Sequence, residues 1–276
     1  MGGQRRRLTG ILDSARSLPG YRDRLASWSP GADPYEALAT LPVLERSRVQ
    51  ADPDAFRDPR VGALALTSSG STGTPLALSL DRRARWRRRR QFGLFFLRHG
   101  WLPWRRSVSV KVVADPSARL GSGALDRTIL ARRTVVSVLD PPDRQFEALR
   151  RADPEILHGL PSALEQIALR AEAAGWRPSR LRRIFTASEA LPPPLRELLE
   201  RALGATVIDS YAASEALVGW ECAHRRGIHV LGGNVVLEVL GDDGEPAQPG
   251  DVGHVVITTL DNRAMPLLRY AIGDLA

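Results

Sequence analysis

Hydroxylated side chains and glycines dominate one short stretch of the chain, LTSSGSTGTPL at residues 66–76. Glycine permits the left-handed backbone with which consecutive N–H groups form a concave, anion-binding ring. The serine and threonine hydroxyls add donors, so the stretch is predicted to bind phosphate; a plain surface turn is the alternative. It is not an ordinary P-loop, because no lysine follows and no helix is expected to open there. Its candidate ligands are Thr67, Ser68, Ser69, Gly70, Ser71, Thr72, Gly73 and Thr74.

Three later stretches also combine hydroxyl, carboxylate, guanidinium or aromatic side chains. They are TASEAL at residues 186–191, DSYAASE at 209–215 and MPLLRYAIGDLA at 265–276. Taken one by one, these side chains have structural alternatives: Tyr211 can be a core residue and Asp274 a helix or turn cap. The candidate residues are Ser188, Glu189, Asp209, Tyr211, Ser214, Glu215, Arg269 and Asp274.

In this order, the four stretches resemble the motifs of the adenylate-forming enzymes, the acyl-CoA synthetase superfamily. A finer resemblance is to the branch of phenylacetate–CoA ligases and coenzyme F390 synthetases. It rests on LPGYRDRL, LPVLERSRV, HGLPSAL, ECAHRRGIHV and TTLDNRAMPLLRY, and it extends over about residues 15–276. The resemblance implies ATP- and Mg²⁺-dependent activation of a carboxylic acid, of aryl or arylacetic type, as an acyl-adenylate. CoA, a carrier protein or an amine would then accept the acyl group.

The resemblance also implies a role for each candidate residue. Ser214 would hydrogen-bond the α-phosphate and Glu215 would ligate Mg²⁺, which makes these two the catalytic pair. The loop at residues 67–74 would hold the β- and γ-phosphates. The others would bind the nucleotide: Tyr211, Ser188 and Glu189 at the adenine, Asp274 at the ribose hydroxyls, Arg269 near ribose and phosphate, and Asp209 in the same motif as Tyr211.

The chain departs from the family pattern in its motifs and at its end. Ala212 stands where the aromatic motif usually has glycine, and Ser188 and Thr74 also differ from the commonest residues. The family continues into a C-terminal subdomain with a phosphate-bridging lysine, whereas this sequence stops at Ala276. We expect a longer parent chain, a separate chain that supplies the subdomain, or activity without it. The alternative to a catalytic chain is a non-catalytic nucleotide-binding remnant or scaffold that needs a partner chain. Lys111, the only lysine, is expected at a strand edge rather than as a substitute.

A basic cluster, DRRARWRRRRQF at residues 81–92, is the strongest charge feature. On a helix, Arg82, Arg85 and Arg89 would share one face, with Trp86 and Arg90 beside them. A solvated face is one interpretation, and a site within Arg82–Arg90 for an anionic partner is the other. The net charge of +8 is a weaker sign of nucleic-acid binding, because arginine is abundant throughout the chain. Nucleic acid is therefore not expected as a partner.

Cys222, His224 and His229 lie close together in the sequence and follow Glu221. Cysteine and histidine are zinc ligands. The spacing is not that of a standard zinc finger, so a zinc site and ordinary loop histidines both remain open.

Strands alternating with helices must position these residues. Apolar strands are expected around residues 63–68, 76–81, 107–113, 133–140, 155–160, 181–187 and 206–212, with helices around 82–98, 143–151, 161–175 and 192–204. A broken helix is expected over 8–27. This pattern predicts an α/β fold with a mostly parallel sheet covered by helices. After about residue 228 the sequence predicts strands and turns but no helix, which indicates an antiparallel β-subdomain. The expected domains are therefore residues 1–227 and 228–276. With one cysteine and no apolar run of about 18 residues, a cytoplasmic location without a membrane partner is expected.

Overall fold

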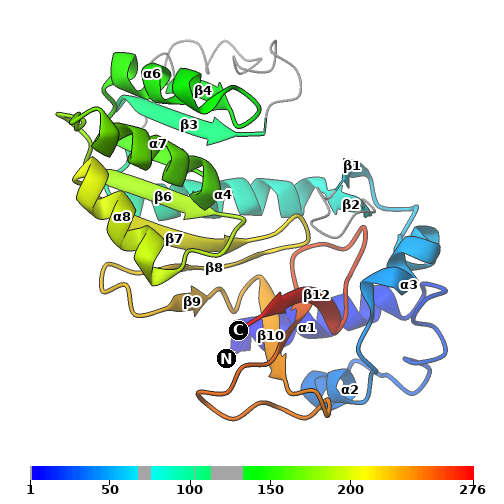
Figure 1. Ribbon diagram of the computed structural model, residues 1–276. Coiled ribbons are helices and arrows are strands. Elements are labelled where there is room, and N and C mark those ends of the chain that lie inside the picture. The colour runs from blue at the N-terminus through cyan, green and yellow to red at the C-terminus, as the bar shows by residue number, and fades with distance from the viewer. Residues whose placement is uncertain (1, 68–75, 103, 113–132) are drawn as a thin grey trace. The chain divides into compact units, whose positions relative to one another are not determined.

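The computed structural model describes residues 2–67, 76–102, 104–112 and 133–276 (Figure 1). The chain forms two compact units. Unit 1 comprises Met1–Gln91, Ala213–Val218 and Val230–Ala276, and unit 2 comprises Phe92–Ala212 and Gly219–His229. These units are defined by how densely their residues contact one another, which does not test whether a segment folds as a domain. The expected domains 1–227 and 228–276 therefore stay a prediction.

Unit 1 contains the N-terminal helices and the antiparallel strands. A hairpin of two strands and a three-stranded sheet in the order β10-β11-β12 are its sheets, and α4 (Arg82–Arg98) begins in this unit. The remaining elements are α1 (Gly2–Ala15), α2 (Pro34–Ala39), α3 (Arg46–Ala51), the 3-10 helix η1 (Pro53–Phe56), β1 (Ala63–Thr67), β2 (Ala77–Asp81), β10 (Val235–Leu240), β11 (His254–Thr259) and β12 (Tyr270–Leu275).

Tyr21 joins the N-terminal segment to the turn before β12. Its hydroxyl donates to the carbonyl of Pro266 at 3.0 Å and accepts from the N–H of Leu268 at 3.1 Å. Tyr21 is fully buried, and this burial raises its pKa. The prediction that the helix resumes after Pro19 was wrong, because residues 16–27 form turns. Proline has no N–H to donate, which breaks the helical hydrogen-bond pattern at that point.

Unit 2 is built on a seven-stranded sheet in the order β4-β3-β5-β6-β7-β8-β9. The strands from β4 to β7 pair in parallel. The helices α6 (Pro142–Ala152), α7 (Pro161–Ala173) and α8 (Pro193–Leu203) connect successive strands. The strands are β3 (Ser107–Lys111), β4 (Arg133–Ser137), β5 (Ile156–Gly159), β6 (Arg183–Ala187), β7 (Thr206–Ala212), β8 (Leu217–Glu221) and β9 (Ile228–Val230).

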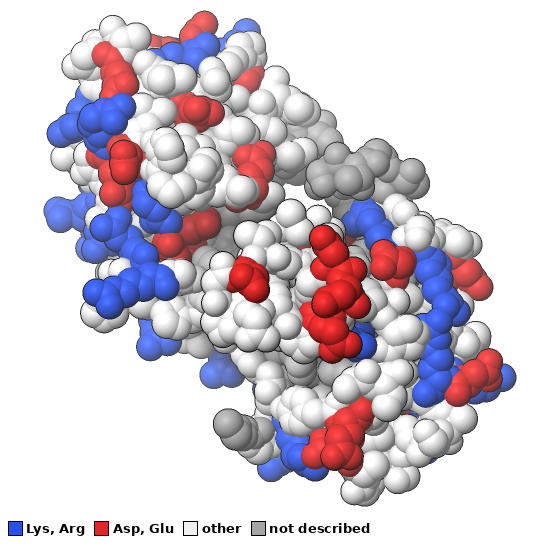
Figure 2. All heavy atoms as spheres, turned by 60° about the horizontal axis from the view of Figure 1, so that its bottom comes forward, with Lys and Arg blue, Asp and Glu red and all other residues white. Residues whose placement is uncertain are grey.

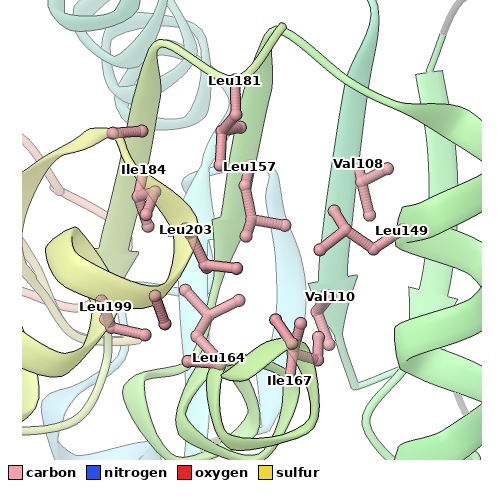
Figure 3. Packing of buried hydrophobic residues seen from close by; sticks show 14 of the residues in the cluster. Val108, Val110, Leu149, Leu157, Leu164, Ile167, Leu181, Ile184, Leu199 and Leu203 are labelled. Atoms are coloured by element: carbon pink, nitrogen blue, oxygen red, sulfur yellow. The ribbon is translucent and has the colours of Figure 1, made fainter. Parts of the chain in front are cut away.

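Successive side chains along these strands point to opposite faces of the sheet, and both faces are buried. Val108, Leu157, Ile184 and Val207 are paired neighbours across four strands, and they pack against the buried side of α6, α7 and α8 (Figure 3). Each fully buried residue of this size stabilises the fold by about 1.5–3 kcal/mol. On the other face, a cluster of Ile156, Phe185 and Ile208 receives Phe95 of α4. The helix-covered parallel sheet predicted from the sequence is therefore confirmed.

The C-terminal strands form the expected antiparallel sheet with one change of membership. β9 was expected to be its first strand, but it lies at the edge of the seven-stranded sheet next to β8. Instead, β12 completes this sheet: it pairs with β11 and contains YAIGD, the part of the RYAIGD sequence that follows Arg269. The backbone N–H of Leu44 donates to the carbonyl of Arg269, and the Leu44 carbonyl accepts from the N–H of Ala271. These two hydrogen bonds hold the start of β12.

Candidate functional site

The predicted phosphate loop falls mostly outside the described residues. Thr67 ends β1, whereas Ser68, Ser69, Gly70, Ser71, Thr72, Gly73 and Thr74 lie outside the described part. The remaining candidates are described, some in unit 1 and some in unit 2.

In unit 1, Ser214 and Glu215 lie in a tight turn. The N–H of Ala213 donates to the carbonyl of Ala216 at 2.8 Å and closes the turn. The Ser214 residue is exposed, whereas Glu215 is buried at 6% exposure. The Glu215 carboxylate accepts two long contacts at 3.4 Å, from the Arg46 guanidinium and from the Tyr270 hydroxyl. Burial, and next the Glu215 charge, raise the pKa of Tyr270, so this hydroxyl stays protonated as the donor.

Arg88 of α4 binds the backbone of the same turn. Its guanidinium donates to the carbonyl of Ser214 at 3.1 Å and to that of Glu215 at 2.6 Å. It also donates to both carboxylate oxygens of Asp261, at 3.0 and 3.3 Å. The two side chains are 11% and 2% exposed, so this ion pair is shielded from water.

In unit 1, Arg269 immediately precedes β12 and Asp274 lies within this strand. Arg269 has a left-handed backbone with φ of 46°. Its guanidinium pairs with Glu238 at 3.0 Å and donates to the carbonyl of Leu41 at 2.6 Å, which fixes the side chain within the unit. Asp274 lies in β12 and is exposed.

In unit 2, Asp209 belongs to a partly buried hydrogen-bond network. Its carboxylate accepts from the Thr186 hydroxyl at 2.7 Å, and its N–H donates to Glu221 at 2.9 Å. Glu221 in turn pairs with Arg196 at 2.6 Å. Burial is the largest cause of a raised pKa at Asp209, opposed by the hydrogen bond from Thr186. Tyr211 follows in β7 and is half-buried.

Ser188 and Glu189 form the loop after β6. Ser188 has a left-handed backbone with φ of 71°, which is unusual for a residue other than glycine. Glu189 accepts from the N–H of Ser162 at 2.8 Å and from its hydroxyl at 3.0 Å. Ser162 lies in the first turn of α7, so Glu189 fixes this loop to the start of that helix.

The basic cluster divides between two sides of α4. Arg88 points inward to Asp261, while Arg82, Arg85, Arg89 and Arg90 are exposed, which agrees both with a solvated face and with a site for an anionic partner. Trp86 is 62% exposed and stacks with the Arg90 guanidinium at 5.7 Å from the ring centroid. On the face drawn in Figure 2, basic and acidic side chains are interspersed.

The structure does not support zinc at Cys222, His224 and His229. Across residues 2–67, 76–102, 104–112 and 133–276, no three His, Cys, Asp or Glu side chains come together to hold a metal ion. Instead, the Cys222 sulfur accepts from the backbone N–H of His224 at 3.4 Å, and His229 lies in the edge strand β9. Lys111 ends β3, as expected. Within the same described ranges, no helix has the length and apolar character to cross a bilayer.

The sequence matches the profile of the AMP-binding enzyme family over residues 25–261. The chain belongs to the AMP-binding enzyme family. This confirms the resemblance to adenylate-forming ligases that the four motifs indicated. The match includes every described candidate residue except Arg269 and Asp274.

Curated relatives of this AMP-binding enzyme are phenylacetate-coenzyme A ligases. The protein from Thermus thermophilus is 34% identical over 140 residues, and that from Pseudomonas putida is 29% identical over 140 residues. The matched stretch is 48% of this chain and only 32% of either relative. Among solved structures, a 2-hydroxyisobutyryl-CoA ligase in complex with 2-HIB-AMP and CoA has the same fold. Its TM-score is 0.75 at 21% identity, over 99% of this chain and 64% of that one.

Several residues that hold the candidate site of this AMP-binding enzyme were missed from the sequence. Arg46, Arg88 and Asp261 surround the Ser214–Glu215 turn, and Arg196 and Glu221 support Asp209. Asp261 lies in TTLDNRAMPLLRY, a stretch singled out for the family resemblance, which was the one available signal for it.

Proposed function

We propose that this chain supplies the nucleotide- and acid-binding part of a ligase that uses ATP to activate a carboxylic acid. The proposed substrate is an aryl or arylacetic acid, activated as an acyl-adenylate. The proposed acceptor is CoA, with a carrier protein or an amine as alternatives. The observation that carries the proposal is the AMP-binding family match over residues 25–261, and the phenylacetate-coenzyme A ligase relatives support the substrate class.

The proposed catalytic pair is Ser214 and Glu215. Attack of a carboxylate on the α-phosphate of ATP expels pyrophosphate, and donors fixed beforehand stabilise the charge that develops. Ser214 is proposed to donate its hydroxyl to the α-phosphate. Glu215 is proposed to hold Mg²⁺, because that ion prefers oxygen ligands and is usually bound by one or two carboxylates together with substrate phosphates. In the structure its carboxylate is in contact with the Arg46 guanidinium and the Tyr270 hydroxyl, both at 3.4 Å, so Mg²⁺ would have to share the carboxylate with these donors or displace them.

The remaining candidates are proposed to hold the nucleotide. The loop at residues 67–74 would donate to the β- and γ-phosphates, and Asp274 would accept from the ribose hydroxyls. Arg269 would lie near ribose and phosphate, although Glu238 already engages its guanidinium. At the adenine we place Tyr211, Ser188, Glu189 and, in the same motif as Tyr211, Asp209.

A C-terminal subdomain with a phosphate-bridging lysine, in the same chain or in a partner chain, completes the proposal. The adenylate-forming enzymes use such a lysine, and Lys111 is the only lysine in the sequence given. We place the enzyme in the cytoplasm.

Acid-dependent release of pyrophosphate tests this function. We would screen aryl, arylacetic and short aliphatic acids with ATP and Mg²⁺, both with this chain alone and with the subdomain added in trans. We expect release with an aryl or arylacetic acid, increased by the subdomain and abolished by Glu215→Ala. The absence of acid-dependent release from every mixture would contradict the proposal.

A second candidate function is supported by the exposed arginines of α4. Arg82, Arg85, Arg89 and Arg90 lie on the solvent side with the exposed Trp86, a combination suited to an anionic partner. A salt-dependent titration with a single-stranded oligonucleotide and with an acidic peptide tests it. Replacing Arg82, Arg85 and Arg89 by alanine should abolish binding of the partner. Equal binding by the wild type and this variant would exclude this face of α4 as the binding site.

A further inference from the structure

One guanidinium ties together three distant segments of unit 1. Arg88 lies in the N-terminal half of α4, Asp261 follows β11, and Ser214 and Glu215 form the turn between β7 and β8. All three nitrogens of the guanidinium are used: Nε and Nη2 by Asp261, and Nη1 and Nη2 by the two backbone carbonyls.

The contacts orient two consecutive peptide groups. The described residues contain no cis peptide bond, so each N–H points away from the carbonyl of the same peptide group. With the carbonyls of Ser214 and Glu215 directed at Arg88, the N–H groups of Glu215 and Ala216 are directed to the opposite side. The backbone from which the Ser214 hydroxyl and the Glu215 carboxylate project is thereby held in one orientation.

Asp261 in turn fixes the orientation of the guanidinium. The two hydrogen bonds at 3.0 and 3.3 Å form a fork, a geometry that arginine can form and lysine cannot. Because the Asp261 side chain is only 2% exposed, water cannot readily replace either bond. Rotation of the guanidinium would therefore break this ion pair as well as the bonds to the turn.

We propose that Arg88 and Asp261 are positioning residues for metal and phosphate binding by Glu215 and Ser214. This role rests on the proposed function, since it gives the held turn its purpose. Neither residue touches the nucleotide; each acts through the backbone of the turn. Loss of a group that orients a metal ligand typically costs 10–100-fold in metal affinity or activity.

Calorimetric titration of ATP at a series of Mg²⁺ concentrations tests the proposal. The variants are Arg88→Lys, Asp261→Asn and the double variant, each checked by thermal unfolding. We expect each single variant to raise the Mg²⁺ concentration for half-maximal ATP binding by about 10–100-fold. The double variant should be little worse than either single one, because both substitutions break the same connection.

Arg60→Lys is the matched control. Arg60 forms a similar fork with Asp58 in the same unit, at 2.8 and 2.9 Å, but neither residue makes a hydrogen bond or ion pair with a candidate site residue that the structure describes. This control should keep the wild-type Mg²⁺ dependence. A lower melting temperature with unchanged Mg²⁺ dependence in both Arg88→Lys and Asp261→Asn would overturn the positioning role and leave the proposed function intact. If the wild-type chain bound no ATP at any Mg²⁺ concentration, the proposed function would fall first, and the role with it.

Discussion

Replacing Glu189 should destabilise the start of α7 by about 1 kcal/mol. The residue that precedes this helix, Leu160, makes no capping hydrogen bond, and Pro161 has no N–H to satisfy. The first N–H that needs a partner is that of Ser162, and Glu189 accepts from it at 2.8 Å. Loss of a helix cap costs about 0.5–2 kcal/mol, and the exposure of both residues allows water to replace part of the interaction.

Three variants separate the parts of this interaction. Glu189→Ala removes both hydrogen bonds and the charge that favours a helix N-terminus, so it should cost about 1 kcal/mol. Glu189→Gln keeps one acceptor oxygen without the charge and should cost about half as much. Ser162→Ala keeps the bond to the N–H and should also cost about half.

Urea unfolding followed by tryptophan fluorescence measures these differences. Glu197→Ala is the control, because Glu197 is exposed on α8 and its side chain makes no hydrogen bond or ion pair with another described residue. In thermal unfolding, a loss of 1 kcal/mol corresponds to about 2–4 °C for a chain of this size. If Glu189→Ala unfolded at the same urea concentration as the control, the two hydrogen bonds would not act as a cap and the reasoning would be refuted.

Three more predictions concern unit 2. Leu164→Ala removes a fully buried side chain of the core in Figure 3 and should cost about 2–5 kcal/mol in urea unfolding; a cost below 1 kcal/mol would contradict the packing. Glu221→Gln leaves Arg196 without its ionic partner and should cost about 3 kcal/mol, whereas an unchanged midpoint would contradict a buried pair. Burial, and next Arg133, lower the pKa of His158 from 6.5 to about 4. The unfolded chain therefore binds the extra proton between pH 6.5 and about 4, so stability should fall by up to about 3 kcal/mol as the pH drops through this range. His158→Gln should remove this contribution and leave a smaller slope from His99, whose pKa is also lowered, chiefly by burial; a slope as steep as that of the wild type would contradict the prediction.

The alternation of apolar residues predicted most of unit 2. Strands such as SVSVK are buried on both faces, and the helices between them have one apolar side, so the order of elements could be inferred. The sequence did not show that β3 lies between β4 and β5, nor that β9 joins the seven-stranded sheet. Short strands carry little information about their neighbours, because pairing depends on the packing of the whole sheet.

The candidate site was predictable in its motifs and not in its supporting contacts. Arg88 and Arg89 are adjacent and chemically identical, yet the first pairs with Asp261 and is only 11% exposed, whereas the second faces the solvent. The partner of Arg88 lies 173 residues away, and no local pattern connects the two. Glu189 was grouped with nucleotide ligands by resemblance, and its bonds to Ser162 depend on the fold of unit 2, which brings the loop after β6 to the first turn of α7.

Binding of Mg·ATP, measured by calorimetry, tests the central claim most directly. The claim is that this chain binds the nucleotide through Glu215 and its neighbours, as a member of the AMP-binding family. We predict saturable binding of Mg·ATP with a Kd between about 1 μM and 1 mM, weakened at least tenfold by Glu215→Gln and strengthened by excess Mg²⁺ over EDTA. Equal binding by the wild type and Glu215→Gln, or no binding by either, would contradict the claim.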